Sequence, residues 1–228
     1  APGQGLAHLV VTQFTDAFDP SRSGEEAPPA AWHDWLLSRH PVPAWPEGTA
    51  GQVHDWCDAL ACTHPVPPLL VGPDDLAVLP YTSGTTGLPK GCMHPHRSLM
   101  HNAVASTLWG NASPETVMLV VVPLFHITGM VTGMHAGLYG GATIVLMPRW
   151  DRELAGRLIS HWKVTSWTNI PTMVIDLLAS PNFSQYDLSS LVYIGGGGAA
   201  MPAAVAQRLF DQFGLRYSEG YGLTETAA

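Results

Sequence analysis

An uncharged central segment constrains the fold of this chain more than any other feature. No Asp, Glu, Lys or Arg occurs between Glu115 and Arg149, a stretch long enough for a membrane-spanning helix. Pro123 and several glycines interrupt the segment, and its apolar runs, TVMLVVV and ATIVLM, are short and β-branched. We therefore predict a strand, a helix and a second strand in a buried α/β core, with no transmembrane segment.

The same alternation continues on both sides of this segment. From Asp74 onward, short apolar runs alternate with stretches of helical periodicity. The predicted strands are LAVLPYT, KVTSWTNI and LVYI, and the predicted helices are HRSLMHNAVASTLW, DRELAGRLISHW, PTMVIDLLAS and PAAVAQRLFDQF. This order predicts an α/β fold, with a mostly parallel sheet covered by helices on both faces.

Residues 1–73 differ from the remainder of the chain. Prolines cluster between Asp19 and Pro68 and leave room for two short helices, around AWHDWLLSRH and GQVHDWCDALAC. We interpret residues 1–73 as a proline-rich peripheral segment and residues 74–228 as the α/β core. The chain does not begin with methionine and stops just after a turn-like run, so we expect it to be part of a longer protein.

Charge and cysteine content exclude two classes of function. The chain has 10 Lys+Arg against 18 Asp+Glu, and the net charge of −8 argues against a nucleic-acid partner. Its three cysteines, Cys57, Cys62 and Cys92, are odd in number and lack C-x-x-C spacing. No set of His, Cys and Asp residues suggests a transition-metal site. We expect a cytoplasmic protein and leave peripheral membrane association and the oligomeric state open.

The segment YTSGTTGLPKG, residues 81–91, has the composition of a phosphate-binding loop. Its glycines allow successive backbone N–H groups to face an anion, its hydroxyls add donors, and Lys90 adds a positive charge. The spacing fits neither the G-x-x-x-x-G-K-[ST] loop nor G-x-G-x-x-G, which argues against a P-loop phosphotransferase. The local alternative is a surface turn with a solvated lysine.

Three further segments follow this loop in order: PLFHITGM, GGGGAAMP and YSEGYGLTET. Together the four motifs resemble the signatures of the adenylate-forming superfamily, which includes acyl-CoA synthetases, aryl-CoA ligases, luciferases and the adenylation domains of peptide synthetases. The resemblance runs from about Asp74 to the last residue. It implies that the chain is part of the large N-terminal domain of an enzyme that activates a carboxylate with ATP to an acyl-adenylate. Transfer to a thiol, usually that of coenzyme A, would follow, with ATP, Mg²⁺ and coenzyme A as cofactors and a small-molecule carboxylic acid as substrate.

The resemblance also assigns roles to individual residues. The residues that would bind the β- and γ-phosphates of ATP are Thr82, Ser83, Gly84, Thr85, Thr86, Gly87 and Lys90. The stretch that would lie between the adenine and the acyl group is Gly196, Gly197, Gly198 and Ala199. Tyr221, followed by Gly222, would pack on the adenine, Thr224 would meet the α-phosphate, and Glu225 would hold Mg²⁺. His126 would lie beside the acyl carboxylate and gate its tunnel. The expected catalytic residues are thus His126, Thr224, Glu225 and Lys90.

Each of these residues also has an ordinary structural alternative. Glu225 can be a solvated loop carboxylate, Tyr221 a half-buried packing residue and His126 a hydrogen-bonded structural histidine. The glycine run can be a flexible turn between a strand and a helix. The remaining histidines of the core, His94, His96, His101 and His135, are interpreted as packing or surface residues.

The segments expected to line the acyl pocket are apolar. They contain Met130, Gly133, Met134, Gly137 and Met173, and no aspartate that could meet an α-amino group occurs between Phe125 and Tyr139. We therefore favour a medium- or long-chain fatty acid over an amino acid, and an aryl acid also fits. Whether the acceptor is coenzyme A or a carrier-protein thiol is left open.

Several family features are missing from this sequence. The family continues beyond GYGLTE to an aspartate for the ribose, an arginine near a hinge and a C-terminal lid domain with a lysine. We therefore expect this chain alone to bind nucleotide weakly and without turnover. The rival hypothesis from another class is a non-catalytic nucleotide- or acyl-binding remnant.

Overall fold

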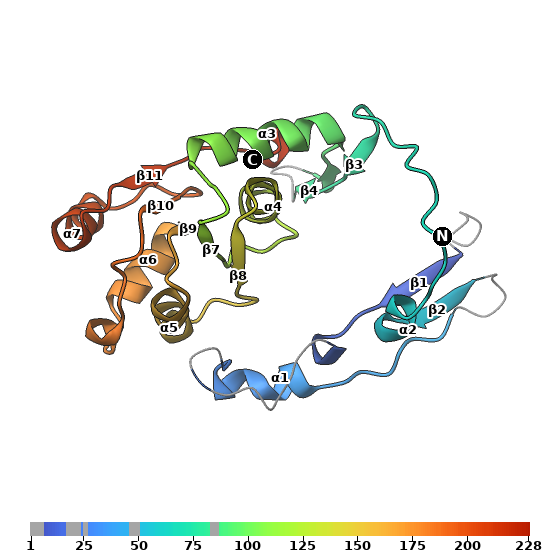
Figure 1. The fold of residues 1–228 in the computed structure, drawn as a ribbon, viewed down its shortest axis with the longest axis horizontal. Coiled ribbons are helices and arrows are strands. Elements are labelled where there is room, and N and C mark those ends of the chain that lie inside the picture. Colours follow the sequence, from blue (N-terminus) through green and yellow to red (C-terminus); the bar gives the residue numbers. More distant parts are fainter. Residues whose placement is uncertain (1–6, 17–23, 25–26, 46–50, 83–86) are drawn as a thin grey trace. The chain divides into compact units, whose positions relative to one another are not determined.

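The computed structural model describes residues 7–16, 24, 27–45, 51–82 and 87–228. The chain divides into two compact units, Ala1–Leu69 and Leu70–Ala228, which are described separately (Figure 1). The first unit contains a parallel ladder of β1 (His8–Val11) and β2 (Gln52–Asp55). Its helical elements are η1 (Phe14–Asp16), η2 (Ala30–Trp32), α1 (His33–Leu37) and α2 (Trp56–Leu60).

The β1–β2 ladder was not predicted, because we assigned all of GQVHDWCDALAC to a helix. The helix begins only at Trp56, where the Asp55 side chain accepts a hydrogen bond from the Cys57 amide at 2.9 Å. A carboxylate at this position caps the start of a helix, so the helix begins after Asp55. The residues up to Asp55 can therefore pair with β1 as a strand.

The second unit is built on a five-stranded, fully parallel sheet with the order β11-β10-β9-β7-β8. The strands are β7 (Val117–Val120), β8 (Thr143–Leu146), β9 (Ser166–Asn169), β10 (Tyr193–Gly196) and β11 (Tyr217–Glu219). The side chains of Leu119, Trp167 and Ile194 are each 1% exposed, so the central strands are buried. The predicted α/β fold with a parallel sheet is confirmed.

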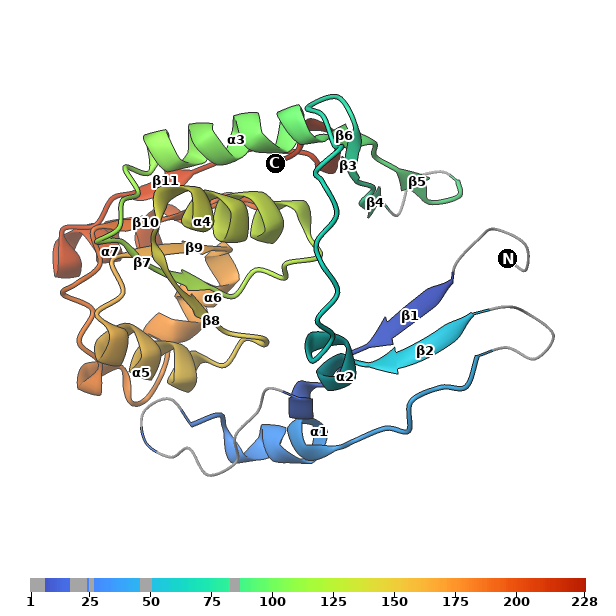
Figure 2. The same cartoon turned by 45° about the vertical axis from the view of Figure 1, so that its right-hand side comes forward.

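Helices cover both faces of this sheet, as Figure 2 shows. On one face lie α3 (His96–Trp109) and α4 (Ala136–Gly140), and on the other lie α5 (Arg152–Trp162) and α6 (Pro171–Leu178). The remaining helices are α7 (Ala203–Phe213) and the short 3₁₀ turns η4 (Phe183–Gln185) and η5 (Thr224–Thr226). Right-handed crossovers explain this arrangement: the step from β7 to β8 runs opposite to the later steps, so α4 and α5 fall on opposite faces.

The reversal between β7 and β9 creates a topological switch point. In open α/β sheets, ligands bind beyond the carboxyl ends of the strands at such a point. The loops after β7, β10 and β11 all leave the sheet at this end, because the strands are parallel.

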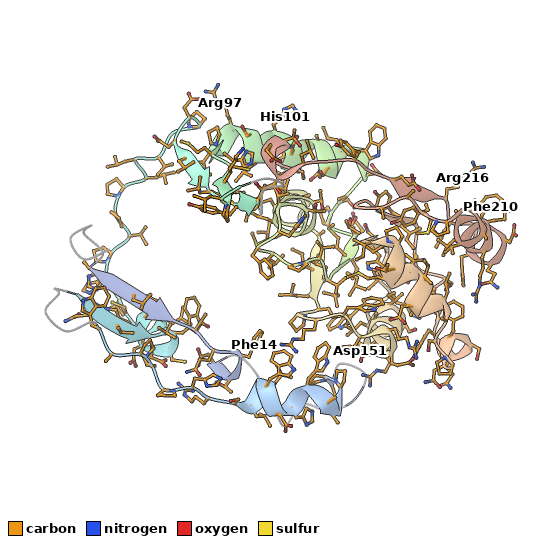
Figure 3. The ribbon with its side chains drawn as sticks, turned by 180° about the vertical axis from the view of Figure 1, so that it is seen from behind. Phe14, Arg97, His101, Asp151, Phe210 and Arg216 are labelled. Atoms are coloured by element: carbon orange, nitrogen blue, oxygen red, sulfur yellow. The ribbon has the colours of Figure 1, made fainter. Side chains whose placement is uncertain are left out.

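Local sequence explains where the covering helices begin and end. Asp151 accepts a hydrogen bond from the Leu154 amide at 2.8 Å and caps α5 (Figure 3), and Pro171 opens α6 at its first turn. At the end of α7, Gly214 adopts φ = +67°, a left-handed conformation that favours glycine. None of the helices in the described residues is long and apolar enough to cross a membrane.

The helix after β7 differs from the regular helix that we predicted. Residues Gly129–His135 form a π-helix, η3, which continues directly into α4. A Cβ atom at Gly129 would lie 2.2 Å from the Pro123 carbonyl oxygen, and one at Gly137 would lie 3.0 Å from Cδ1 of Ile144. Glycine therefore lets this helix approach the loop after β7 and the sheet itself, and π-helical turns are frequent at functional sites.

The prediction that LAVLPYT forms one strand of the sheet is wrong. The segment splits into β3 (Leu76–Val78) and β4 (Tyr81–Thr82). These pair antiparallel with β6 (His94–Pro95) and β5 (Lys90–Gly91), respectively, outside the five-stranded sheet. Pro80 lies between the two pieces and has no N–H to continue a ladder.

Candidate active site

The candidate phosphate loop begins and ends in two paired strands, β4 and β5. Tyr81 pairs with Gly91 and Thr82 with Lys90, and the Cys92 amide donates to the Pro80 carbonyl at 2.8 Å. Thr82 is half-buried, whereas Gly87 and Lys90 are exposed. The predicted phosphate-binding residues Ser83, Gly84, Thr85 and Thr86 lie outside the described residues. The ladder thus places Thr82 and Lys90 opposite each other, in the pair next to the connecting residues.

Backbone packing requires glycine in part of the GGGGAAMP segment. A Cβ atom at Gly196 would lie 1.8 Å from the Asn169 carbonyl oxygen, and one at Gly197 would lie 2.4 Å from the Gly220 carbonyl oxygen. The Gly220 amide also donates to the Gly196 carbonyl at 2.7 Å. These two glycines therefore allow the ends of β9, β10 and β11 to approach closely, a reason that the resemblance alone did not supply.

The following residues of that segment face open space. Gly198 has φ = +83°, a Cβ atom there would meet no other atom within 4 Å, and Ala199 is exposed. The last residue of β11 holds the far end of the segment, because Glu219 Oε1 accepts a hydrogen bond from the Met201 amide at 2.7 Å. The segment is thus fixed at both ends and open in the middle.

A buried polar pair beneath this segment was missed by sequence reasoning. The Tyr217 hydroxyl donates to Asn169 Oδ1 at 3.0 Å, and Asn169 is 1% exposed. Burial, together with the nearby Glu219 and Tyr193, raises the pKa of Tyr217 to about 12, so the hydroxyl stays protonated as a donor. The available sequence signal was a polar residue on each of two strands, Asn169 at the end of β9 and Tyr217 at the start of β11, which lie on either side of β10.

The GYGLTE segment forms a compact turn after β11. Thr226 Oγ1 accepts the Leu223 amide at 3.1 Å and donates to the Leu223 carbonyl at 2.9 Å, which closes η5. The Tyr221 ring is 91% exposed, Glu225 is exposed and Thr224 is half-buried. Gly222 is required by the backbone, because a Cβ atom there would lie 2.4 Å from the carbonyl carbon of Ala228.

Two side chains bind this turn to the region that follows the hairpin. His94 Nε2 lies 2.7 Å from the Thr224 carbonyl oxygen, and Asn102 Nδ2 donates to the Thr226 carbonyl at 2.8 Å. Figure 2 shows the C-terminal turn beside β6 and the start of α3, which carry these residues. His94 is 5% exposed, so it is a packing residue as predicted, but its polar contact with the turn was not foreseen.

A small apolar cluster brings the segment of His126 to the same place. Ala227 packs with Ile127, the residue after His126, in a buried cluster completed by Leu99, Ala103 and Val131. The structure thus joins β6 and α3, which follow the hairpin, with the PLFHITGM segment and the GYGLTE turn. The Gly220 to Gly196 hydrogen bond adds the GGGGAAMP segment to this group.

His126 is exposed at the start of the helix that follows β7. Its Nδ1 accepts the Thr128 amide at 3.2 Å. In the neutral imidazole with an accepting Nδ1, the proton lies on Nε2. The ring can therefore offer an N–H donor to an oxygen of a ligand at the carboxyl end of β7.

An apolar cavity lies between η3 and the sheet near His126. Its lining residues are Met118, Leu119, Val120, Val122, Gly129, Thr132, Gly133 and Thr168. Of the residues that we expected to line an acyl pocket, Gly133 contributes to this cavity, whereas Gly137 packs against Ile144 and Met118.

Glu225 has the right chemistry for Mg²⁺, although it is a single carboxylate. Mg²⁺ is usually held by one or two carboxylates together with phosphate oxygens and water, and Glu225 is exposed to accept such a ligand set. It could therefore hold Mg²⁺ together with a bound nucleotide.

Within the described ranges, three acidic or thiol side chains with metal-ligand spacing gather in the first unit: Asp16, Asp55 and Cys57. The Arg39 guanidinium pairs with both carboxylates, at 3.5 Å from Asp16 and 3.0 Å from Asp55. Desolvation and these two carboxylates raise the pKa of the Cys57 thiol. One Arg39 guanidinium shared by two carboxylates forms a small ion-pair network, and we assign no metal to these three side chains.

Comparison with known proteins places these features in a family. A family model described as AMP-binding enzyme matches residues 6–228. The 4-coumarate–CoA ligase 2 of Nicotiana tabacum is 36% identical over 167 residues, which cover 71% of this chain and 31% of that protein. The long-chain-fatty-acid–CoA ligase of Bacillus subtilis is 36% identical over 155 residues, which cover 67% of this chain and 28% of that protein.

A solved structure agrees with these sequence matches. The ATP-bound crystal structure of MatB from Rhodopseudomonas palustris is similar with a TM-score of 0.69 and 25% identity, and the match covers 78% of this chain and 36% of that one. The chain thus spans about a third of the length of the relatives it matches. With the family model covering nearly all of its residues, this chain belongs to the AMP-binding enzymes, the adenylate-forming superfamily that its four motifs resemble.

Proposed function

We propose that the protein activates a carboxylic acid with ATP to an acyl-adenylate and then transfers the acyl group to coenzyme A. The observation that carries this proposal is the 2.7 Å contact between His94 and the Thr224 carbonyl. It ties the turn of Tyr221, Thr224 and Glu225 to β6, which directly follows the hairpin strand that carries Lys90. Family membership and the ATP-bound structural relative support the nucleotide assignment.

In the first step, a carboxylate oxygen of the acid bonds to the α-phosphorus of ATP, and the bond to pyrophosphate breaks. Negative charge builds up on the phosphoryl oxygens, so nearby donors and cations stabilise the transition state. Lys90 is exposed on β5 and would balance charge on the β- and γ-phosphates, and Thr224 would donate to the α-phosphate. No general base is needed, because the acid is already ionised at neutral pH.

Other residues would orient the two substrates. The Tyr221 ring, 91% exposed, offers a free face for stacking on the adenine. His126 would donate a hydrogen bond from Nε2–H to the acyl carboxylate and hold the carboxylate beside the cavity under η3. Mg²⁺, held by Glu225 with the phosphates, would supply charge neutralisation. In the second step, a thiol attacks the acyl carbon and AMP leaves.

For the acid itself, we favour a medium- or long-chain fatty acid. The mainly apolar lining of the cavity supports this choice, since it has no charged side chain to pair with an amino group. The second candidate is an aryl acid, favoured by the similarity to a 4-coumarate–CoA ligase. We further propose a cytoplasmic location.

The test is a pyrophosphate-release and hydroxamate screen of the full-length parent protein. Acids of graded chain length are compared with benzoates and cinnamates. A maximum on medium or long fatty acids supports the first candidate, and a maximum on the aromatic acids supports the second. Nucleotide binding without release of pyrophosphate from any acid would favour the non-catalytic remnant and refute the ligase.

A further inference from the structure

Apart from Ala227, which is buried, the turn that carries Thr224 and Glu225 has little burial of its own. Glu225 and Tyr221 are exposed, and even the apolar Leu223 is 46% exposed. Ala227 adopts φ = +66°, a left-handed conformation that costs energy for a residue other than glycine. Contacts from outside the turn are therefore needed to keep it in one conformation.

His94 provides such a contact from a rigid position. It is 5% exposed and lies on β6, where it pairs with Val78 of β3. Since a carbonyl oxygen can only accept, His94 Nε2 donates to the Thr224 carbonyl, at 2.7 Å. The alternative partner of that carbonyl within the turn, the Ala227 amide, is more distant at 3.4 Å.

We propose that His94 is a positioning residue that couples the phosphate hairpin to the Thr224 turn. His94 comes shortly after Lys90 in the sequence. The same segment therefore carries the positive charge of the hairpin, on Lys90, and the imidazole donor that holds the Thr224 turn. Asn102 adds a second, more exposed tether through the Thr226 carbonyl at 2.8 Å. The proposal rests on the proposed function only in that the turn is taken to contact the nucleotide.

Loss of the His94 donor should reduce the fraction of molecules in which the turn is ordered. Removing the donor leaves a partly buried carbonyl with a weak partner, which lowers the competent fraction by about tenfold. The apparent nucleotide affinity falls by the same factor, because only the ordered turn completes the site. His94→Leu removes the donor and keeps the burial, whereas His94→Gln restores an N–H near the position of Nε2.

The test uses the 228-residue chain and two readouts. Hydrogen exchange measures the order of residues 222–228, and a fluorescent methylanthraniloyl-ATP with Mg²⁺ measures nucleotide binding. In His94→Leu, we expect exchange in residues 222–228 to be about tenfold faster, with β7 and β9 unchanged, and nucleotide binding about tenfold weaker. His94→Gln should restore both. The matched control is His101→Leu, which removes an exposed histidine from the outer face of α3 (Figure 3).

The possible results test two statements separately: that His94 holds the Thr224 turn, and that the chain binds nucleotide. Unchanged exchange in His94→Leu, or equal effects of His94→Leu and His94→Gln, overturns the tether. If the parent chain does not bind the fluorescent nucleotide, the proposed function fails, and the exchange data still decide the tether. If His94→Leu does not fold, Asn102→Ala takes its place. It should speed exchange by about threefold, and no change would count against the proposal.

Discussion

Replacing Gly196 with alanine tests how closely the strand ends approach at the candidate site. The new methyl group would lie 1.8 Å from the Asn169 carbonyl oxygen, which belongs to the backbone of the neighbouring strand and cannot rotate away. The strands must separate, at an overpacking cost of about 3 kcal/mol. The hydrogen bond from the Gly220 amide to the Gly196 carbonyl would be lost as well, adding about 1 kcal/mol.

The total of about 4 kcal/mol corresponds to a decrease in Tm of about 8–16 °C for a domain of this size. Circular dichroism during thermal unfolding measures it directly. Two other glycine-to-alanine variants serve as controls. At Gly198, space is open but φ is +83°, so about 1 kcal/mol is expected. At Gly87, nothing lies within 4 Å, and no significant change is expected. An alanine at Gly196 that is tolerated as well as one at Gly87 would refute the close approach.

Three further predictions address other parts of the second unit. Tyr217→Phe leaves buried Asn169 Oδ1 without its donor, so chemical denaturation should show a loss of about 1–2 kcal/mol, whereas an equal or higher stability would contradict the buried pair. Hydrogen bonds from Tyr186 and Ser180 lower the pKa of Glu153 from the usual 4.5 to about 2; the resulting stabilisation is complete above about pH 5 and is lost as the pH falls toward 2, and Glu153→Gln should flatten this acid limb of the Tm profile. Glu225→Gln should abolish the increase in nucleotide affinity that Mg²⁺ gives the parent chain, and an unchanged increase in a titration with and without Mg²⁺ would exclude Glu225 as the metal ligand.

Much of the fold could be predicted from the sequence because its signals are local. The segment HRSLMHNAVASTLW is helical over its whole length as α3, and Pro171 marks the first residue of α6. The alternation of apolar runs and helices also predicted the parallel sheet, since crossover connections require it.

The differences arise where distant segments determine the conformation. Gly129 forms part of a π-helix because the loop after β7 passes within 2.2 Å of the place that a Cβ atom would take, a contact that periodicity does not report. The β3 and β4 strands lie outside the five-stranded sheet, and Pro80, which separates them, has no N–H to continue a ladder of hydrogen bonds. The short β1 and β2 strands depend on each other across more than forty residues, as the pairing of His8 with Gln52 shows.

In the candidate site, too, the residues in local motifs could be predicted and those that depend on distant contacts could not. Motif order identified Tyr221, Thr224, Glu225 and Lys90, whose assigned roles stay predictions. The residues that support them, His94 and Asn169, belong to no short motif, and their contacts join residues 130 and 48 positions apart in the sequence. Only the packed fold brings such partners together.

We propose that the hairpin and the Tyr221–Glu225 turn bind one nucleotide between them. Hydrogen exchange of the chain with and without ATP and Mg²⁺ measures this most directly. We predict that residues 87–91 and 220–226 become protected together, and that protection is complete at one equivalent of bound ATP. Protection of only one of these segments, or of neither while ATP is bound, would contradict it.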